Sequence, residues 1–429
     1  ISRILDSKAL SEFRWTTAVE MKKHGGVIHE MDLPEYETYF STLSEKTRND
    51  VISTWGVPPG EGMVLGGSIL ITGVSFGNVV VAVQPKRGCF GTRCDGQVCK
   101  ILHDPACPPT HQYLATYHYY ADVWGADVIM HTGTHGSMEW TPGKGIGMTG
   151  DCYPDICMRN VPHLYIYNSD NPSEGLVAKR RSYATLVDHM QHLMVGVNLY
   201  GPYAELDGLL SEYGTARNDP THADELRRKI IDKAAEAKMD DLGLDEDASL
   251  EECVRLCHEA LSVIRNSQMN KGMHIFGRMP EGEDLVDAVF SIVRYGEEHD
   301  SLRDSIADSI GYDLSELYRD QGRIDPDSGR SYGMLIEDID ELAREFTKGI
   351  LGGSDAESVL KSMGLDASEP SAFAKFVDMI EDIRSRIDSS DEVGSLMNGY
   401  DGGYISPGPS GYITRGRYDI MPTGRNFYA

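Results

Sequence analysis

Basic residues are scarce in this sequence relative to acidic ones. Its 429 residues include 40 Lys and Arg against 67 Asp and Glu, which gives a formal net charge of −27. A protein with such a charge repels phosphate backbones and anionic lipid headgroups. We therefore do not expect the chain as a whole to bind nucleic acid or a membrane surface.

Long apolar runs and targeting signals are also missing. The uncharged stretch 62–85 could cross a bilayer by length, but glycines and polar residues interrupt it. We interpret it as two buried strands joined by a turn at Gly73–Asn78. The first residues lack the apolar core of a signal peptide and begin with Ile1. We expect a cytoplasmic protein without a transmembrane segment, either excised from a longer polypeptide or a shortened homologue.

The eight cysteines form no disulfide framework, which suits a reducing compartment. Four of them, Cys89, Cys94, Cys99 and Cys107, fall within nineteen residues. Their spacing lacks the paired C-x-x-C of a zinc or iron–sulfur site. Reduced thiols are the favoured interpretation, and the role of this cluster stays open.

The first part of the chain, residues 1–200, alternates β-branched runs with amphipathic stretches, which predicts an α/β layered region. The expected strands are Ser68–Thr72, Val79–Val83, Asp127–Met130 and Leu164–Tyr167. The expected helices are Glu35–Thr54, His111–Val123 and Ser173–Leu193. Loops at strand ends are then the expected place for chemistry.

The second part, residues 201–400, is predicted to be mostly helical and carries most of the charge, −24 against −4 for residues 1–200. Apolar residues recur at helical spacing in Ala223–Lys238, Leu250–Asn266, Glu283–Val293, Met334–Ile350 and Pro370–Asp388. A closing segment, 401–429, is rich in Gly, Pro and Tyr. It is expected to be either an ordered wrapping loop or a flexible tail.

The most informative run follows the strand expected at Asp127–Met130. His131, His135 and Glu139 lie within nine residues in a glycine-rich loop. Imidazole and carboxylate groups bind borderline divalent metals and accept protons near neutral pH. We therefore predict a metal or proton-transfer site here, although a single histidine at a strand end is usually structural.

Neighbouring polar residues extend this candidate site. His103 and His111 precede a helix, and Glu174 lies in the first turn of another that carries Lys179, Arg180 and Arg181. A local basic cluster in so acidic a chain is a candidate site for an anionic substrate or partner. A phosphate-binding loop around Lys144 is not supported, because Gly145 stands where Ser or Thr should bind magnesium.

Several of these segments together resemble one family. They are VQPKRG (83–88), HDP (103–105), PPTHQYLATY (108–117), ADVIMHTGTHGSMEWTPGK (126–144), CYPD (152–155), NPSEGLVAKRRSYA (171–184), GMHIFGRMP (272–280) and PTGRNFYA (422–429). In this order they resemble the large subunit of cobaltochelatase, whose family includes the porphyrin-binding subunit of magnesium chelatase. HDP and the closing PTGRNFY are more similar to the cobalt branch.

The resemblance implies a nitrogen–metal ligase of cobalamin biosynthesis. Such a subunit binds a tetrapyrrole and inserts a divalent metal, with cobalt favoured and magnesium or nickel as alternatives. Separate AAA+ ATPase and adaptor subunits would use the ATP, which this chain would not bind. The acidic helices are then either a solubilising scaffold or a docking face for basic partner surfaces.

The resemblance also suggests roles for the candidate residues. His131, His135 and Glu139 would deliver the metal and accept protons, with His103 and His111 completing the metal's surroundings. Ring carboxylates would pair with cations, for which the candidates are Arg87, Lys144, Lys179, Arg180 and Arg181. Glu174 would either contact the substrate or orient its own helix.

Two other functions fit the same residues. Two His and one carboxylate with a water also describe a hydrolytic zinc site, although no H-E-x-x-H helix is present. A non-catalytic tetrapyrrole-binding protein could use the histidines only to coordinate a metallated ring. A change from the free-base to the metallated visible spectrum would distinguish chelation from binding alone.

Overall fold

The fold is described from a computed structural model of the chain. It describes residues 7–10, 16–88, 104–191, 194–196, 202–216, 219–244, 248–266, 268–270, 274–296, 300–365, 370–413 and 417–428. His103 and the cysteines at 89, 94 and 99 lie outside these residues. Two compact units are present, and the closing segment contributes to both. The first comprises residues 1–189, 392–410 and 424–429, and the second comprises 190–391 and 411–423.

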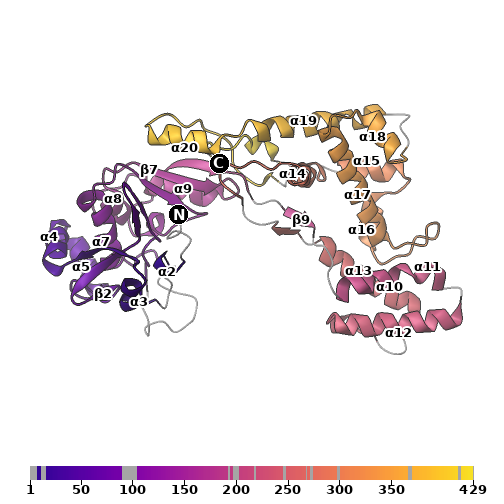
Figure 1. Ribbon diagram of the computed structural model, residues 1–429, viewed down its shortest axis with the longest axis horizontal. Helices are drawn as coiled ribbons and strands as arrows, with labels where there is room; N and C mark the ends of the chain where they lie inside the picture. The colour runs from indigo at the N-terminus through magenta and orange to yellow at the C-terminus, as the bar shows by residue number, and fades with distance from the viewer. Residues whose placement is uncertain are drawn as a thin grey trace. The chain divides into compact units, whose positions relative to one another are not determined.

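The first unit contains a three-stranded parallel sheet of order β6-β7-β8, whose central strand β7 is labelled in Figure 1. The strands are β6 (Ile129–Thr132), β7 (His163–Asn168) and β8 (Thr185–His189). All six residues of the central strand β7 are buried, as expected for a parallel strand covered on both faces. The first unit is therefore of the α/β class, as predicted.

Two helices cover opposite faces of this sheet. Leu186 of β8 clusters with Ala178 of α9 (Pro172–Arg181), whereas Leu164 of β7 lies against Gly399 of α20 (Glu392–Tyr400). Leu164 and Tyr165, which belongs to the α9 cluster, are consecutive and so point to opposite faces. The α9 face carries the histidines and tyrosines of the candidate site.

The expected helix Ser173–Leu193 is wrong beyond Arg181. Ser182 caps α9, and Tyr183 adopts a positive φ of 55°, which ends the helix. The following residues form β8, where Thr185 and Val187 have the β-branched side chains that strands favour. Residues 424–426 pair with this strand, since Asp188 N donates to Arg425 O at 2.9 Å.

An antiparallel sheet and several helices complete the first unit. The sheet has the order β1-β3-β2, with β1 (Val27–Met31), β3 (Ser68–Thr72) and β2 (Val64–Leu65). The turn expected at Gly73–Asn78 is instead a hairpin of β4 (Val74–Phe76) and β5 (Val79–Val81). Val79 is 55% exposed, so the second expected strand is only partly buried.

The helices of the first unit differ from the prediction mainly at one break. The expected helix Glu35–Thr54 is two helices, α4 (Leu33–Thr42) and α5 (Glu45–Trp55), because Ser44 caps the second by accepting from Thr47 N. Helix α7 (His111–His118) continues into a π-helical turn, η2 (Tyr119–Val123). The remaining short helices are α2 (Ser7–Leu10), α3 (Ala18–Lys23), η3 (Met138–Trp140) and α8 (Tyr153–Met158).

The second unit is mostly helical, as predicted. Helices α13 (Leu250–Asn266) and α14 (Glu283–Val293) have the expected bounds. Three more lie within a few residues of expectation, namely α12 (Pro220–Glu236), α17 (Tyr332–Leu351) and α19 (Ala374–Asp388), which follows η5 (Pro370–Phe373). The unpredicted elements are β9 (Met194–Gly196), α10 (Pro202–Ser211), α11 (Tyr213–Ala216), η4 (Asp240–Leu242), β10 (Gln268–Asn270), α15 (Leu302–Ser309), α16 (Leu314–Arg319), α18 (Ala356–Ser362) and η7 (Tyr418–Ile420).

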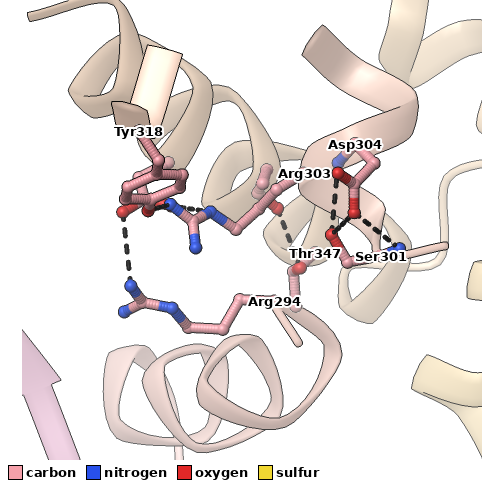
Figure 2. A network of polar contacts seen from close by, with 8 residues as sticks. Arg294, Ser301, Arg303, Asp304, Tyr318 and Thr347 are labelled. Atoms are coloured by element: carbon pink, nitrogen blue, oxygen red, sulfur yellow. Dashed lines mark hydrogen bonds and ion pairs between the residues drawn. The ribbon is translucent and has the colours of Figure 1, made fainter. Parts of the chain in front are cut away.

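A polar network lies among the packed helices of this unit (Figure 2). Arg303 Nε lies 2.5 Å from Asp340 Oδ1, and Arg294 lies 3.5 Å from the other carboxylate oxygen. The Arg303 guanidinium also contacts the ring of Tyr318. Both arginine side chains are at least nine-tenths buried, so one carboxylate compensates two enclosed cations. No helix among the described residues is long and apolar enough to span a membrane.

Candidate functional site

Glu139 is the most enclosed carboxylate of the predicted site. It lies on η3, in the loop that follows β6, and has no exposed surface. Its Oε1 accepts a hydrogen bond from Gly136 N at 2.9 Å, while Oε2 is buried without a partner among the described residues. Desolvation raises the pKa of Glu139, and nearby Glu174 raises it further. The group is therefore a carboxyl that takes up a proton more readily than an exposed glutamate.

Gly136 lets polar groups from three segments approach one point. A Cβ atom at this position would lie 3.1 Å from Gln84 Oε1, 3.1 Å from Tyr165 Oη and 3.4 Å from Glu139 Oε2. Only a residue without a side chain leaves that space open. The glycine of the loop is thus required by close packing around Glu139.

His135 and Glu174 form an ion pair at the same loop. His135 Nδ1 lies 2.9 Å from Glu174 Oε2, with the two side chains 59% and 33% exposed. Glu174 lies in the first turn of α9, where a carboxylate is favoured by the helix dipole. The structure therefore brings together His135 and Glu174, and places Glu139 close enough for both to influence its pKa.

His131 lies on strand β6, just before the loop that carries His135. Its Nε2 is 3.0 Å from the Tyr117 hydroxyl, which receives a hydrogen bond from Gln84 Nε2 at 2.8 Å. Gln84 Oε1 accepts from Ser137 N at 2.7 Å and from Ser137 Oγ at 2.9 Å. This chain of contacts ties the strand, helix α7 and the loop together. Burial and the neighbouring His163 lower the pKa of His131 well below its ordinary value.

A small pocket adjoins His131. Its volume is about 130 Å³, and its walls come from residues 80–85, from α7 and η2, and from β6. The lining includes Tyr117, Tyr120 and Trp124, and it contains no Asp, Glu, Lys or Arg side chain. A cavity of this size can hold one small ring or substituent.

Most of the predicted cations contact the protein itself. Lys179 Nζ donates to Phe427 O at 2.9 Å, and Arg181 donates to Thr141 O at 2.5 Å. Buried Arg87 donates to Asp104 O at 3.0 Å. Lys144 and Arg180 are exposed. The first three cations thus support the loops and the closing segment, and the last two face solvent.

His111 is not brought to the site. It is buried, with Nδ1 2.8 Å from Tyr36 Oη and Nε2 2.9 Å from Gly56 O, so both ring nitrogens are hydrogen-bonded within the protein. Cys107 is buried and forms no disulfide with a described cysteine. Within the described ranges, no three His, Cys, Asp or Glu side chains are grouped so that they could hold a metal ion.

Sequence reasoning missed four side chains around the site. Gln84 and Tyr117 lie within the motifs 83–88 and 108–117, yet their polar contacts depend on long-range packing. Tyr165 and His163 lie on β7, which was expected as a strand over Leu164–Tyr167 without a role for either side chain. Alternation along β7 could have indicated them, because His163 and Tyr165 point to the same face of the sheet. His131 points to that face too, since the register pairs it with Tyr165.

Comparisons with known proteins agree with the motifs. A family model described as CobN/Magnesium Chelatase matches residues 1–429. An uncharacterized protein of Methanocaldococcus jannaschii is 43% identical over 99% of this chain and 34% of its own length. The aerobic cobaltochelatase subunit CobN of a Sinorhizobium species is 30% identical over 99% of this chain and 35% of its own length.

A solved structure is also similar. The catalytic subunit of cobaltochelatase from Mycobacterium tuberculosis matches with a TM-score of 0.74 and 30% identity, over 94% of this chain and 34% of that chain. The chain thus spans about a third of the length of these relatives.

Proposed function

The chain belongs to the CobN/magnesium chelatase family, and from this premise we propose that it carries the metal-inserting site of a chelatase large subunit. Such a subunit binds a tetrapyrrole and places a divalent metal in it. The observation that carries the proposal is the enclosed carboxyl of Glu139 beside the His135–Glu174 pair. We place the reaction at this loop.

Metallation requires a base, because two protons must leave the inner nitrogens of the ring as the metal enters. Glu139 suits that role because its raised pKa brings it closer to neutral pH, where a general base works best. His135, which is more than half exposed, can pass the proton on to solvent while Glu174 orients its ring. His131, at the start of the loop, holds its position through a hydrogen bond with Tyr117.

We propose that the metal is handled as a substrate and held weakly by the protein. His135 and Glu174 offer one imidazole and one carboxylate, and the ring nitrogens supply the remaining ligands. Because a metal in transit must be released, two protein ligands serve better than a closed set of four. Cobalt is the favoured metal, with magnesium and nickel as alternatives that the same ligand types accept.

For the substrate, we propose that Lys144 and Arg180 pair with ring carboxylates. Both are exposed and close in sequence to the loop or helix that carries the reactive groups. Arg87, Lys179 and Arg181 would act indirectly, because their donors are bound to backbone carbonyls. A tetrapyrrole of cobalamin biosynthesis, a corrin precursor, is the favoured substrate.

We further propose that AAA+ ATPase and adaptor subunits supply the ATP-driven step in the cytoplasm. No phosphate-binding loop is present in the sequence. The acidic residues of 201–400 offer a docking face for basic surfaces of those partners.

The test is metallation by the full subunit with its partners, followed by visible absorption. Glu139→Gln should lower kcat by roughly 10²- to 10⁴-fold, the typical contribution of a general base, with tetrapyrrole binding retained. Glu37→Gln, on the exposed surface of α4, is the matched control and should leave kcat unchanged. A normal rate in Glu139→Gln would remove Glu139 from the mechanism. Binding without metallation in the wild-type complex would favour a non-catalytic tetrapyrrole-binding role.

A further inference from the structure

A glycine-rich loop joins η3, which carries Glu139, to helix α8. We call its residues 144–149 the flap, and 145–148 (Gly-Ile-Gly-Met) the tip of the flap. The tip forms no hydrogen bond with another described residue. Gly147 has a positive φ of 64°, which residues with a side chain rarely adopt. A segment held by so few contacts moves at a low cost in free energy.

One sulfur atom holds both ends of the flap. Lys144 N donates to Sγ of the buried Cys152 at 3.3 Å, and Thr149 N donates to the same atom at 3.4 Å. Gly143 allows this close approach, because a Cβ atom there would lie only 2.7 Å from Cys152 Cβ. The flap therefore has a fixed base and a loosely held tip.

The base of the flap is also tied to the helix that carries Glu174. Arg181, the last residue of α9, donates to Thr141 O at 2.5 Å and to Gly143 O at 3.5 Å. Glu174 precedes Arg181 by seven residues, which is about 10 Å along the helix axis. A macrocycle centred on the His135–Glu174 pair can therefore extend to the flap.

The exposed side chains of this region suit a flat apolar ring with acidic substituents. Ile146, in the tip, is 74% exposed, and Trp140, next to Glu139, is 41% exposed. Covering such side chains with an apolar ligand is favourable. Lys144 is exposed at the base and offers a cation to a carboxylate. A tetrapyrrole combines an apolar ring with carboxylates at its edge.

We propose that the flap closes over the bound tetrapyrrole, with Ile146 contacting the apolar face of the ring and Cys152 acting as a positioning residue for the flap. This inference rests on the proposed function and adds a substrate contact to it. The closed flap excludes water from the ring and slows its release. Closure also brings Lys144 to the edge of the ring, where the carboxylates lie.

The first test is tetrapyrrole affinity of the full subunit. Two probes cover the ring types, namely coproporphyrin, a carboxylated free-base porphyrin, and a carboxylated metal-free corrin. Ile146→Ser should raise the dissociation constant of the bound probe by roughly five- to thirty-fold, mainly through faster dissociation. Val57→Ser, at a loop position that is 69% exposed, is the matched control and should bind normally.

Two failures of this test have different meanings. Equal affinities for the wild type and Ile146→Ser would overturn the flap proposal while the proposed function stands. A wild-type subunit that binds neither probe would contradict the proposed function itself. Ile146 is exposed, so its variant is expected to retain the fold.

The second test is hydrogen exchange of the backbone amides. Those of 145–148 should exchange rapidly in the free subunit and become protected when a probe binds, whereas Lys144 and Thr149 should exchange slowly in both states. A tip that stays unprotected with a bound probe would overturn the closure of the flap.

Variants of Cys152 test the base of the flap. Cys152→Ala removes the acceptor, so exchange at Lys144 and Thr149 should become faster and probe affinity should fall roughly five-fold. Cys152→Ser, whose hydroxyl also accepts, should restore part of both. Wild-type exchange and affinity in Cys152→Ala would show that Cys152 does not position the flap. Should Cys152→Ala fail to fold, Ile146→Ser and the protection of the tip still decide the proposal.

Discussion

Asp188 Oδ1 accepts a hydrogen bond from Gly424 N at 2.8 Å, across 236 residues of sequence. The same oxygen accepts from Arg425 N at 2.7 Å, so one carboxylate at the end of β8 holds the closing segment. Its Oδ2 is buried without a partner among the described residues. Burial, with Glu392 nearby, raises the pKa of Asp188 to about 7.

Asp188 should therefore make stability depend on pH. A raised pKa means that the folded state binds a proton that the unfolded state releases, so the free energy of unfolding falls as pH rises from 3.8 to about 7. We expect Asp188→Asn to flatten this dependence, because the amide oxygen still accepts from Gly424 and Arg425 but no longer titrates. Urea unfolding across this pH range measures the slope. Asp151→Asn, an exposed control, should keep the wild-type slope, and an unchanged slope in Asp188→Asn would contradict the assignment.

Gly136→Ala should disturb the site by crowding. The added methyl would stand 3.1 Å from Gln84 Oε1 and Tyr165 Oη, so the loop or these side chains must move. We expect a loss of roughly 1–3 kcal/mol in stability, as for other overpacked positions, and a metallation rate lowered by at least about ten-fold. Gly150→Ala is the matched control, because its Cβ would meet nothing within 4 Å. Equal rates for the two variants would mean that the packing around Glu139 is not critical.

The acid limb of the metallation rate should report Glu139. As the proposed base it must be ionised, so kcat should fall as pH drops through its pKa, which lies above the ordinary 4.5 because of desolvation. His135 lowers this pKa and Glu174 raises it. His135→Ala should consequently move the limb to higher pH and Glu174→Gln to lower pH. Shifts in the same direction for both variants would show that another group controls the limb.

The Arg294–Arg303–Asp340 network in the second unit should be sensitive to loss of the Asp340 carboxylate. Removing Asp340 leaves two enclosed guanidinium groups without their counter-ion, which typically costs about 3–5 kcal/mol. We expect Asp340→Ala to lower the urea midpoint of the helical unit accordingly. The exposed pair Arg384–Asp388 provides a control, since Asp388→Ala should cost less than about 1 kcal/mol. Similar losses in the two variants would assign the effect to general charge rather than to burial.

The sequence predicted what local patterns determine. Helices α13 and α14 have the predicted bounds because their apolar residues recur regularly, and the loop carrying His135 and Glu139 was recognised from its composition. The hydrogen bond between Asp188 and Gly424 could not be predicted from local patterns, because it joins positions 236 residues apart. For the same reason the hydrogen bonds of Gln84 to Tyr117 and Ser137 emerge only once the chain is packed. His111 was likewise predicted as a metal ligand, but in the folded chain both nitrogens of its ring form hydrogen bonds, to Tyr36 and to Gly56.

Association with the proposed ATPase partners should depend strongly on salt if the acidic helices form the docking face. Residues 201–400 carry a net charge of −24, and exposed charges are screened over about 10 Å at 0.1 M ionic strength. We expect the association rate to fall steeply as salt rises, because opposite charges steer the encounter. Reversing three exposed acids of this part, Asp232→Lys, Glu251→Lys and Glu381→Lys, should weaken association and flatten its salt dependence.

Reversing Glu37 and Asp151 in the first unit is the control for total charge, and this pair should change association less. The acidic helices could instead serve only to keep the protein in solution. In that case the salt dependence would be weak, and both sets of reversals would leave association by surface plasmon resonance unchanged. A salt dependence that persists in the triple reversal would place the docking face elsewhere on the chain, because the charges that cause it would still be present.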